Sequence, residues 1–209
     1  QSPSFPSASP AVANATPLLR PGAPAGACPL DYLLMVSTIE PRKNHLTLLA
    51  AWEQLRSTTH PNLELVLVGN LGWEHASIKQ KLQPWVGRGL HVLEEVPASE
   101  LRVLYQHAQV TVCPSFGEGF DYSGVEAMQS GGVVAASDIP VHREVYGDAA
   151  RYFSAYAALD VRRCLSDMLA SGQSDREVMI ATGAEVCRRY TMSELLPAWV
   201  QLLNKVINS

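Results

Sequence analysis

The sequence predicts an α/β fold, in which a Rossmann-like parallel sheet is covered by helices on both faces. Two observations support this prediction. From residue 32 onwards, short and continuously apolar runs alternate with amphipathic stretches, as expected for buried parallel strands joined by crossover helices. The last part of the chain contains helical patterns alone. With 209 residues, the chain is long enough for one sizeable domain.

Each expected element follows from its apolar period. The strands are expected at residues 32–37, 63–69, 90–94, 110–115 and 131–137. Helices are expected between them at residues 45–57, 76–86, 99–108 and 123–130, and then at 159–171, 174–190 and 193–208. Residues 1–29 are rich in Pro, Ala, Ser and Gly, which is typical of a linker or disordered tail. The folded domain is therefore predicted over residues 30–209.

Composition narrows the function classes. A formal net charge of −4 gives no general field for a polyanion, so nucleic acid is not an expected partner. The chain has no apolar run of about 20 residues and no signal-peptide pattern. The four cysteines are far apart and form no CxxC pair, so we expect reduced, structural thiols and a cytoplasmic location. The chain begins with Gln1, which suggests a piece of a longer protein.

The loop after the first expected strand carries Pro41, Arg42, Lys43 and Asn44 at the entrance to the next helix. Ligands of doubly wound sheets bind beyond the carboxyl ends of the strands. Adjacent cations beside exposed helix amides would suit a diphosphate there. On composition alone, the favoured interpretation of Arg42 and Lys43 is a solvated charge pair, because basic residues do not favour a helix N-terminus.

The loop after the fourth expected strand is the most specific segment of the chain. It places Glu118 and Glu126 eight residues apart, and an ionised carboxylate can accept hydrogen bonds from the two hydroxyls of a sugar or ribose diol. Glu118 could instead be an exposed loop residue, although the flanking glycines favour close ligand approach. Glu126 has capping-box spacing from Ser123 and could serve the helix start as well.

The loop after the fifth expected strand carries Asp138, His142, Arg143 and Glu144. His142 could hydrogen-bond a ligand, but the favoured interpretation is a surface histidine at a helix start. The other histidines show no metal-ligand spacing, so no metal site is expected.

Four segments resemble, in order and spacing, the C-terminal domain of retaining glycosyltransferases of the group 1 or family 4 type. They are EPRKN at 40–44, the run at 90–115, EGFDYSGVEAM at 118–128 and the run at 131–150. This family includes bacterial lipopolysaccharide and capsule mannosyltransferases, sucrose synthase and relatives of bacterial glycogen synthases. The resemblance covers about residues 30 to 205, and its motifs are specific in combination.

The resemblance implies the GT-B architecture, in which two Rossmann-like domains face each other and the C-terminal one binds the nucleotide sugar. Residues 30–209 would be that domain, and the N-terminal acceptor domain would be missing. The catalytic residues it implies are Arg42 and Lys43 on the donor diphosphate and Glu118 near the donor sugar. Glu126 would accept from the ribose hydroxyls. Donor contacts are further implied for Gly119, Phe120, Asp121, Tyr122 and Ser123, and base contacts for the segment from Leu93 to Val96. No metal or other cofactor is implied.

The sequence departs from the family's common EGFGLP, because Asp121, Tyr122 and Ser123 replace Gly-Leu-Pro. A carboxylate at 121 would repel an anionic ligand unless it turns away or binds a sugar hydroxyl. Aspartate here resembles some mannosyltransferases of surface polysaccharide synthesis, so GDP-mannose is the first expected donor among GDP- and UDP-sugars.

The activity implied by the resemblance is retaining transfer of a hexose to a glycan or lipid-linked acceptor in lipopolysaccharide or polysaccharide synthesis. The missing domain could bring peripheral contact with the cytoplasmic membrane, and this piece alone would be inactive. The alternatives are a non-catalytic interaction module and a phosphorylase or epimerase on the same fold.

Overall fold

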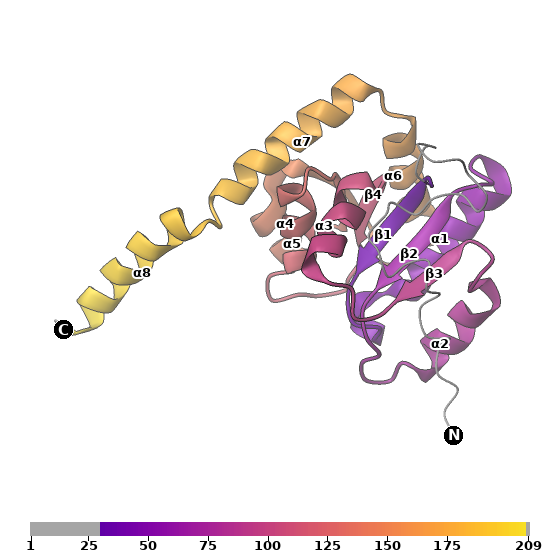
Figure 1. Cartoon of the computed structure of the whole chain (residues 1–209), viewed down its shortest axis with the longest axis horizontal. Helices are drawn as coiled ribbons and strands as arrows, with labels where there is room; N and C mark the ends of the chain where they lie inside the picture. Colours follow the sequence, from indigo (N-terminus) through magenta and orange to yellow (C-terminus); the bar gives the residue numbers. More distant parts are fainter. Residues whose placement is uncertain (1–29, 208–209) are drawn as a thin grey trace.

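The computed structural model describes residues 30–207, and within them six parallel strands form one sheet in the order β3-β2-β1-β4-β5-β6 (Figure 1). The predicted linker at 1–29, which includes Cys28, lies outside the described residues. The strands are β1 Tyr32–Val36, β2 Glu64–Val68, β3 Leu90–Leu93, β4 Val110–Cys113, β5 Val134–Ser137 and β6 Ala150–Phe153. This confirms the predicted Rossmann-like fold class and the five predicted strands.

The sheet is buried because alternate strand residues face two separate apolar layers. On β1, Leu33 and Met35 join the layer under α1, α2 and α6, whereas Tyr32 and Leu34 join the layer under α3, α4, α5 and α7. The helices of the first layer are α1 His45–Thr58, α2 Ala76–Leu82 and α6 Ala158–Ala170. Those of the second are α3 Ala98–His107, α4 Tyr122–Gln129, α5 Pro140–Tyr146 and α7 Gln173–Arg188.

The sixth strand, β6, was not predicted. It pairs with β5 from Val134↔Ala150 to Ser137↔Phe153 and forms one edge of the sheet. Its first and last residues are buried, and its two middle residues, of which the first is an arginine, are more exposed. A strand so short and so polar lacks the continuous apolar run that marks the buried central strands.

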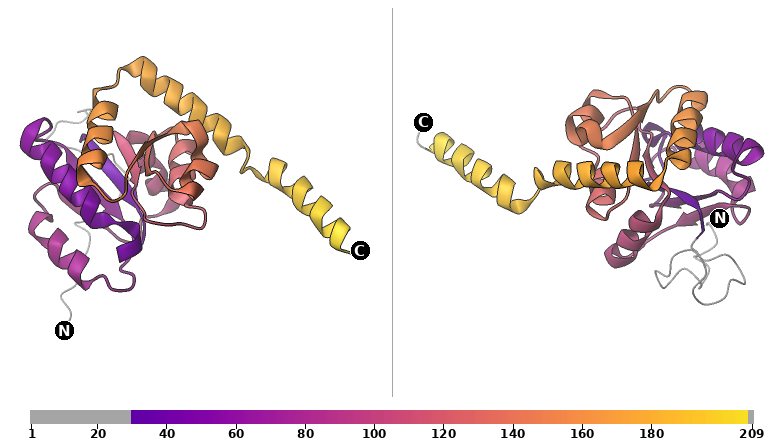
Figure 2. Two further views of the ribbon diagram at one scale, coloured as in Figure 1. Left: turned by 180° about the vertical axis from the view of Figure 1, so that it is seen from behind. Right: turned by 90° about the horizontal axis from the view of Figure 1, so that it is seen from above.

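The chain ends in helices, as predicted. Helix α7 packs against α4, and α8 Met192–Ile207 extends beyond it, away from the sheet (Figures 1 and 2). No residue of α8 is buried. Within residues 30–207, no helix combines the length and apolarity that crossing a membrane requires.

Candidate functional site

The predicted site residues lie around the loops that follow β1 and β4. These two strands are neighbours in the sheet, and the order of strands reverses between them. Loops that diverge at such a switch point leave a crevice at the carboxyl edge of a doubly wound sheet. The fold therefore brings the segment at 40–44 next to the segment at 114–121.

Arg42, Lys43 and Glu118 form one contact cluster. Arg42 Nη1 donates to Glu118 Oε2 at 2.6 Å, and Lys43 Nζ donates to Glu118 Oε1 at 2.6 Å. The Glu118 side chain is 6% exposed, so its interpretation as an exposed loop residue is wrong. The interpretation of Arg42 and Lys43 as a merely solvated charge pair is wrong as well, since both cations share one carboxylate.

The backbone that carries Arg42 and Lys43 is held in a defined conformation. A short 3-10 turn, Pro41–Lys43, is followed by Asn44 at φ 63°, a left-handed conformation that asparagine tolerates. The Asn44 side chain is buried, and its Nδ2 donates to Pro114 O at 2.9 Å and to Ala155 O at 2.8 Å. One amide thus ties the loop after β1 to the loops after β4 and β6.

The charges in this cluster balance among themselves. Arg42 also binds Glu40 Oε1 at 2.8 Å, so two cations meet two carboxylates. Burial raises the pKa of Glu118, but hydrogen bonds from Lys43, Ser115 and Arg42 outweigh burial and hold this pKa below its ordinary value. Glu118 is therefore ionised at neutral pH. The Arg42 side chain stays 41% exposed, which leaves part of its guanidinium accessible to an anionic ligand.

Asp121 begins α4 as its N-cap, at φ 65°. Its Oδ1 accepts from Ser123 N at 3.3 Å and from Ser123 Oγ at 2.6 Å. The predicted capping box between Ser123 and Glu126 is therefore wrong, because the cap lies two residues earlier. The left-handed backbone also explains why glycine is common at this position in the resembling family.

The second carboxylate oxygen of Asp121 turns inward. It lies 3.0 Å from His142 Nε2, and the His142 side chain is 0% exposed, so the interpretation of His142 as a surface histidine is wrong. His142 Nδ1 lies 2.9 Å from Ser137 O, and the Ser137 hydroxyl already donates to Ser115 O. His142 Nε2 is thus paired with the Asp121 carboxylate, and Nδ1 lies within hydrogen-bonding distance of the carbonyl and hydroxyl oxygens of Ser137.

Burial raises the pKa of Asp121. The hydrogen bonds from His142 and Ser123 and the charges of His142 and Lys43 outweigh burial, so the pKa lies below its ordinary value. Asp121 is thus ionised, and these hydrogen bonds and charges compensate its negative charge. The repulsion expected between Asp121 and an anionic ligand is reduced by this pairing.

Glu126 lies apart from this cluster, on the side of α4 that faces α3. Its Oε2 accepts from Tyr105 Oη at 3.1 Å. The two residues line a cavity of about 340 Å³ together with Ala98, Leu101, Arg102, Gln129 and Ser130. Leu93 and Val96 precede α3. The Leu93 side chain is buried in the core, so only its backbone and the following loop are available to a ligand.

The other predicted contact residues line the loop before α4. Gly119 and Tyr122 are exposed, Tyr122 by 71%, and Phe120 is half-buried. The Phe120 ring lies 4.7 Å from the Tyr122 ring and 5.0 Å from the Tyr190 ring, between centroids. These residues therefore present backbone and aromatic edges next to the cluster.

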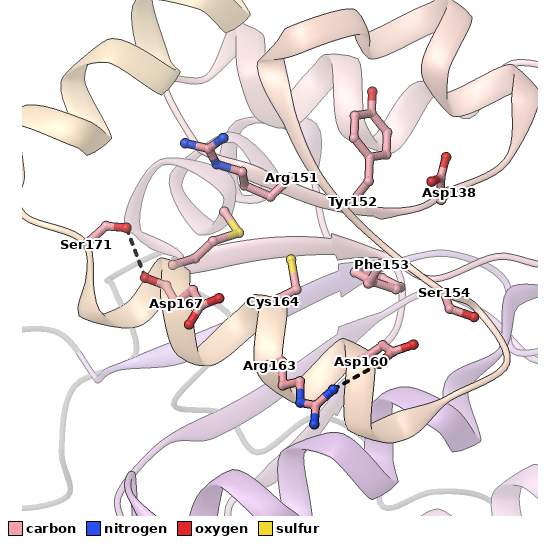
Figure 3. A pocket seen from close by; sticks show the side chains of 11 residues that line it. Asp138, Arg151, Tyr152, Phe153, Ser154, Asp160, Arg163, Cys164, Asp167 and Ser171 are labelled. Atoms are coloured by element: carbon pink, nitrogen blue, oxygen red, sulfur yellow. Dashed lines mark hydrogen bonds and ion pairs between the residues drawn. The ribbon is translucent and has the colours of Figure 1, made fainter.

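Another cavity lies elsewhere. It measures about 620 Å³ and is lined mainly by residues of β6 and α6, with Cys164 and Asp167 on one side and Arg151 and Tyr152 on the other (Figure 3). Of the residues named from the sequence, it includes only Asp138. It does not coincide with the predicted donor site.

Sequence reasoning did not assign a role in the site to Glu40, Asn44, Ser115 or Tyr105, and it misplaced His142. Asn44 carried a usable signal, because an asparagine between two helical turns often adopts a left-handed conformation. Tyr105 carried none, since its partner lies 21 residues away on another helix. Within residues 30–207, no three His, Cys, Asp or Glu side chains gather in a metal-binding arrangement. Cys113, Cys164 and Cys187 are free thiols.

Comparison with known sequences gives a consistent family. The profile of "Glycosyl transferases group 1" matches residues 29–183. The serotype-specific mannosyltransferase WbdA of Escherichia coli is 37% identical over 139 residues, which are 66% of this chain and 17% of that protein. The O-antigen chain mannosyltransferase B of Escherichia coli is 33% identical over 181 residues, which are 85% of this chain and 45% of that protein. The chain thus spans less than half the length of these relatives.

Solved structures agree on the fold. A UDP-forming α,α-trehalose-phosphate synthase from Burkholderia xenovorans superposes with a TM-score of 0.76 at 17% identity, covering 86% of this chain and 45% of that one. The sucrose-phosphate synthase from Thermosynechococcus elongatus gives a TM-score of 0.76 at 23% identity, covering 86% of this chain and 46% of that one.

Proposed function

Because this chain belongs to the group 1 glycosyl transferases, we propose that its carboxyl-edge cluster binds the diphosphate of a nucleotide-sugar donor, for transfer of the sugar with retention. The observation that supports this most directly is the convergence of Arg42 and Lys43 on Glu118 at 2.6 Å. Two cations fixed at the carboxyl edge of the sheet, at its switch point, suit a diphosphate by charge and by position.

The chemistry asks for such cations. Breaking the bond between sugar and phosphate develops negative charge on the departing diphosphate, and positioned positive charge stabilises it. In this proposal Arg42 and Lys43 perform that role without a metal ion. Glu118 contacts both cations, and in this proposal its ionised carboxylate would face the positive charge that a donor sugar develops at the anomeric carbon.

The donor is proposed to be GDP-mannose. The sugar is supported by the names of two relatives, which describe mannosyltransferases. The guanine base is supported by the sequence resemblance alone. The acceptor is proposed to be a glycan or lipid-linked saccharide of surface polysaccharide synthesis, as the name of the O-antigen relative suggests. Acceptor binding would fall to the part of the fold that lies outside this chain.

Calorimetric titration of the chain with GDP, UDP, ADP and their sugar conjugates tests the donor site. We expect one nucleotide to bind selectively. Lys43→Ala should weaken that binding by about 1.5 to 3 kcal/mol, the loss of a charge-assisted contact. Lys81→Ala is the matched control. It also removes one positive charge, but from an exposed lysine on α2. Absence of binding by every nucleotide, or equal effects of both variants, would contradict the proposal.

A further inference from the structure

A buried tyrosine donates a hydrogen bond to the carboxylate of the exposed residue Glu126. Tyr105 is 1% exposed and lies in the core layer between α3 and the sheet. Its hydroxyl donates to Glu126 Oε2 at 3.1 Å. Glu126 Oε1 has no hydrogen-bond partner among residues 30–207. One oxygen of the carboxylate is thus anchored, and the Glu126 residue lines the cavity between α3 and α4.

This cavity adjoins the segment that the sequence resemblance assigns to the base. Ala98 and Leu101 line it from the first turn of α3, two and five residues after Val96. Glu126 lines it from the fifth position of α4, whose N-cap, Asp121, interacts electrostatically with Glu118 and Lys43 of the cluster described above. A nucleoside placed here would have its base near the start of α3, its ribose at Glu126 and its diphosphate toward the N-terminus of α4.

We propose that Tyr105 is a positioning residue that orients the Glu126 carboxylate for the cis-diol of the donor ribose. The inference rests on the proposed donor site. An exposed glutamate rotates about three side-chain bonds, and fixing it on ligand binding costs conformational entropy. The bond from Tyr105 fixes the carboxylate in advance, because the tyrosine ring itself is immobilised by packing. Oε1 and the remaining lone pair of Oε2 then present two acceptors to two neighbouring hydroxyls.

The tyrosine stays a donor at every relevant pH. Burial, followed by the charge of Glu126, raises the pKa of Tyr105 far above its ordinary value. Its single proton can point to only one acceptor, and Glu126 Oε2 is the partner that the structure gives it. The hydrogen bond from Tyr105 therefore fixes the orientation of the Glu126 carboxylate.

The test compares a ribonucleotide with its dideoxy form. The probes are GDP, UDP or ADP, whichever binds the wild-type chain most tightly, and the 2′,3′-dideoxy form of the same nucleotide. Tyr105→Phe keeps the ring in the core and removes only the hydroxyl. We expect it to raise the Kd of the ribonucleotide about three- to tenfold, the equivalent of one net hydrogen bond, and to leave the Kd of the dideoxynucleotide unchanged. A purely structural role would change both Kd values alike.

Two further variants make the result specific. Tyr32→Phe is the matched control, because Tyr32 is a fully buried tyrosine of the same layer whose hydroxyl donates to Leu104 O at 2.8 Å. It should leave the ratio of the two Kd values unchanged. In a Glu126→Ala background, Tyr105→Phe should have no further effect on nucleotide binding.

The outcomes separate the two claims. If the wild type binds no nucleotide, the donor site itself fails, and the role of Tyr105 fails with it. If the wild type binds and Tyr105→Phe retains the full preference for the ribonucleotide, only the role of Tyr105 is refuted. A loss of preference in Tyr105→Phe that persists unchanged in the Glu126→Ala background would also overturn it.

Discussion

Replacing Asp121 by alanine tests the buried support of the candidate site. The substitution removes the partner of His142 Nε2, the N-cap of α4 and a residue that tolerates φ 65°. Asparagine at the same position keeps an acceptor for Ser123 and also tolerates the left-handed conformation. The pair of variants therefore separates the whole interaction from its charge.

The magnitudes follow from the contacts. Removing the carboxylate breaks a buried hydrogen bond between His142 and a charged group, which costs about 1.5 to 3 kcal/mol. The cap and the backbone strain each add about 1 kcal/mol. We expect Asp121→Ala to lower the free energy of unfolding by about 3 to 5 kcal/mol, and Asp121→Asn by about 0.5 to 1.5 kcal/mol.

Thermal and urea unfolding followed by circular dichroism measure both effects at neutral pH. In a chain of this size, about 3 to 5 kcal/mol corresponds to a fall in Tm on the order of 10 °C, and the asparagine variant should lose only a few degrees. An Asp121→Ala protein within about 1 kcal/mol of the wild type would refute the reasoning, because the lost buried hydrogen bond and helix cap together should cost more than that. Equal losses in both variants would mean that charge alone matters.

The acid limb gives an independent check on the same pair. The pKa of Asp121 is lowered in the folded protein, so its ionisation contributes stability that is fully present above the unfolded pKa. That stability is lost as the pH falls through the folded pKa. The difference in unfolding free energy between the wild type and Asp121→Asn should therefore shrink toward zero in acid. A constant difference down to the lowest pH at which the protein folds would contradict the assignment.

Three further substitutions probe the surroundings of the site. Gly124→Ala should cost about 1 to 3 kcal/mol of unfolding free energy, because its Cβ would lie 2.3 Å from Cζ of the fully buried Tyr146. Asn44→Ala should cost about 2 to 4 kcal/mol by urea unfolding, because it leaves two buried carbonyls without their amide donor and strains a left-handed residue. Glu118→Gln should weaken nucleotide binding in calorimetry, because Lys43 loses a charged partner and its side chain becomes less fixed. Tighter binding would show that Glu118 mainly competes with the ligand for Arg42 and Lys43.

The central strands could be predicted because the apolar pattern that marks each of them lies within its own few residues. The strands β1, β2 and β4 are apolar runs with turns at both ends, and such runs mark buried parallel strands without any tertiary knowledge. The strand β6 could not be found in this way. Its stability comes from pairing with β5 at the edge of the sheet, and its own four residues, with Arg151 exposed, carry no apolar run.

The site shows the same division between local and distant information. Arg42, Lys43 and Glu118 were named from the sequence, but their contact depends on pairing between β1 and β4 and joins residues 75 and 76 positions apart. The cap of α4 was misassigned to Ser123 because sequence spacing alone ignores backbone conformation. The inward turn of Asp121 depends on His142, which is 21 residues away on α5.

The departure at position 121 follows from these contacts. The backbone there is left-handed, and glycine meets this requirement without strain, whereas aspartate meets it at some cost. Aspartate also adds a negative charge close to Glu118 and Lys43. His142 addresses the second problem: its Nε2 lies 3.0 Å from the inward oxygen of the Asp121 carboxylate, and this contact helps to lower the pKa of Asp121. Aspartate at 121 and histidine at 142 therefore form one unit, and either residue without the other would leave a buried polar group unpaired next to the cluster.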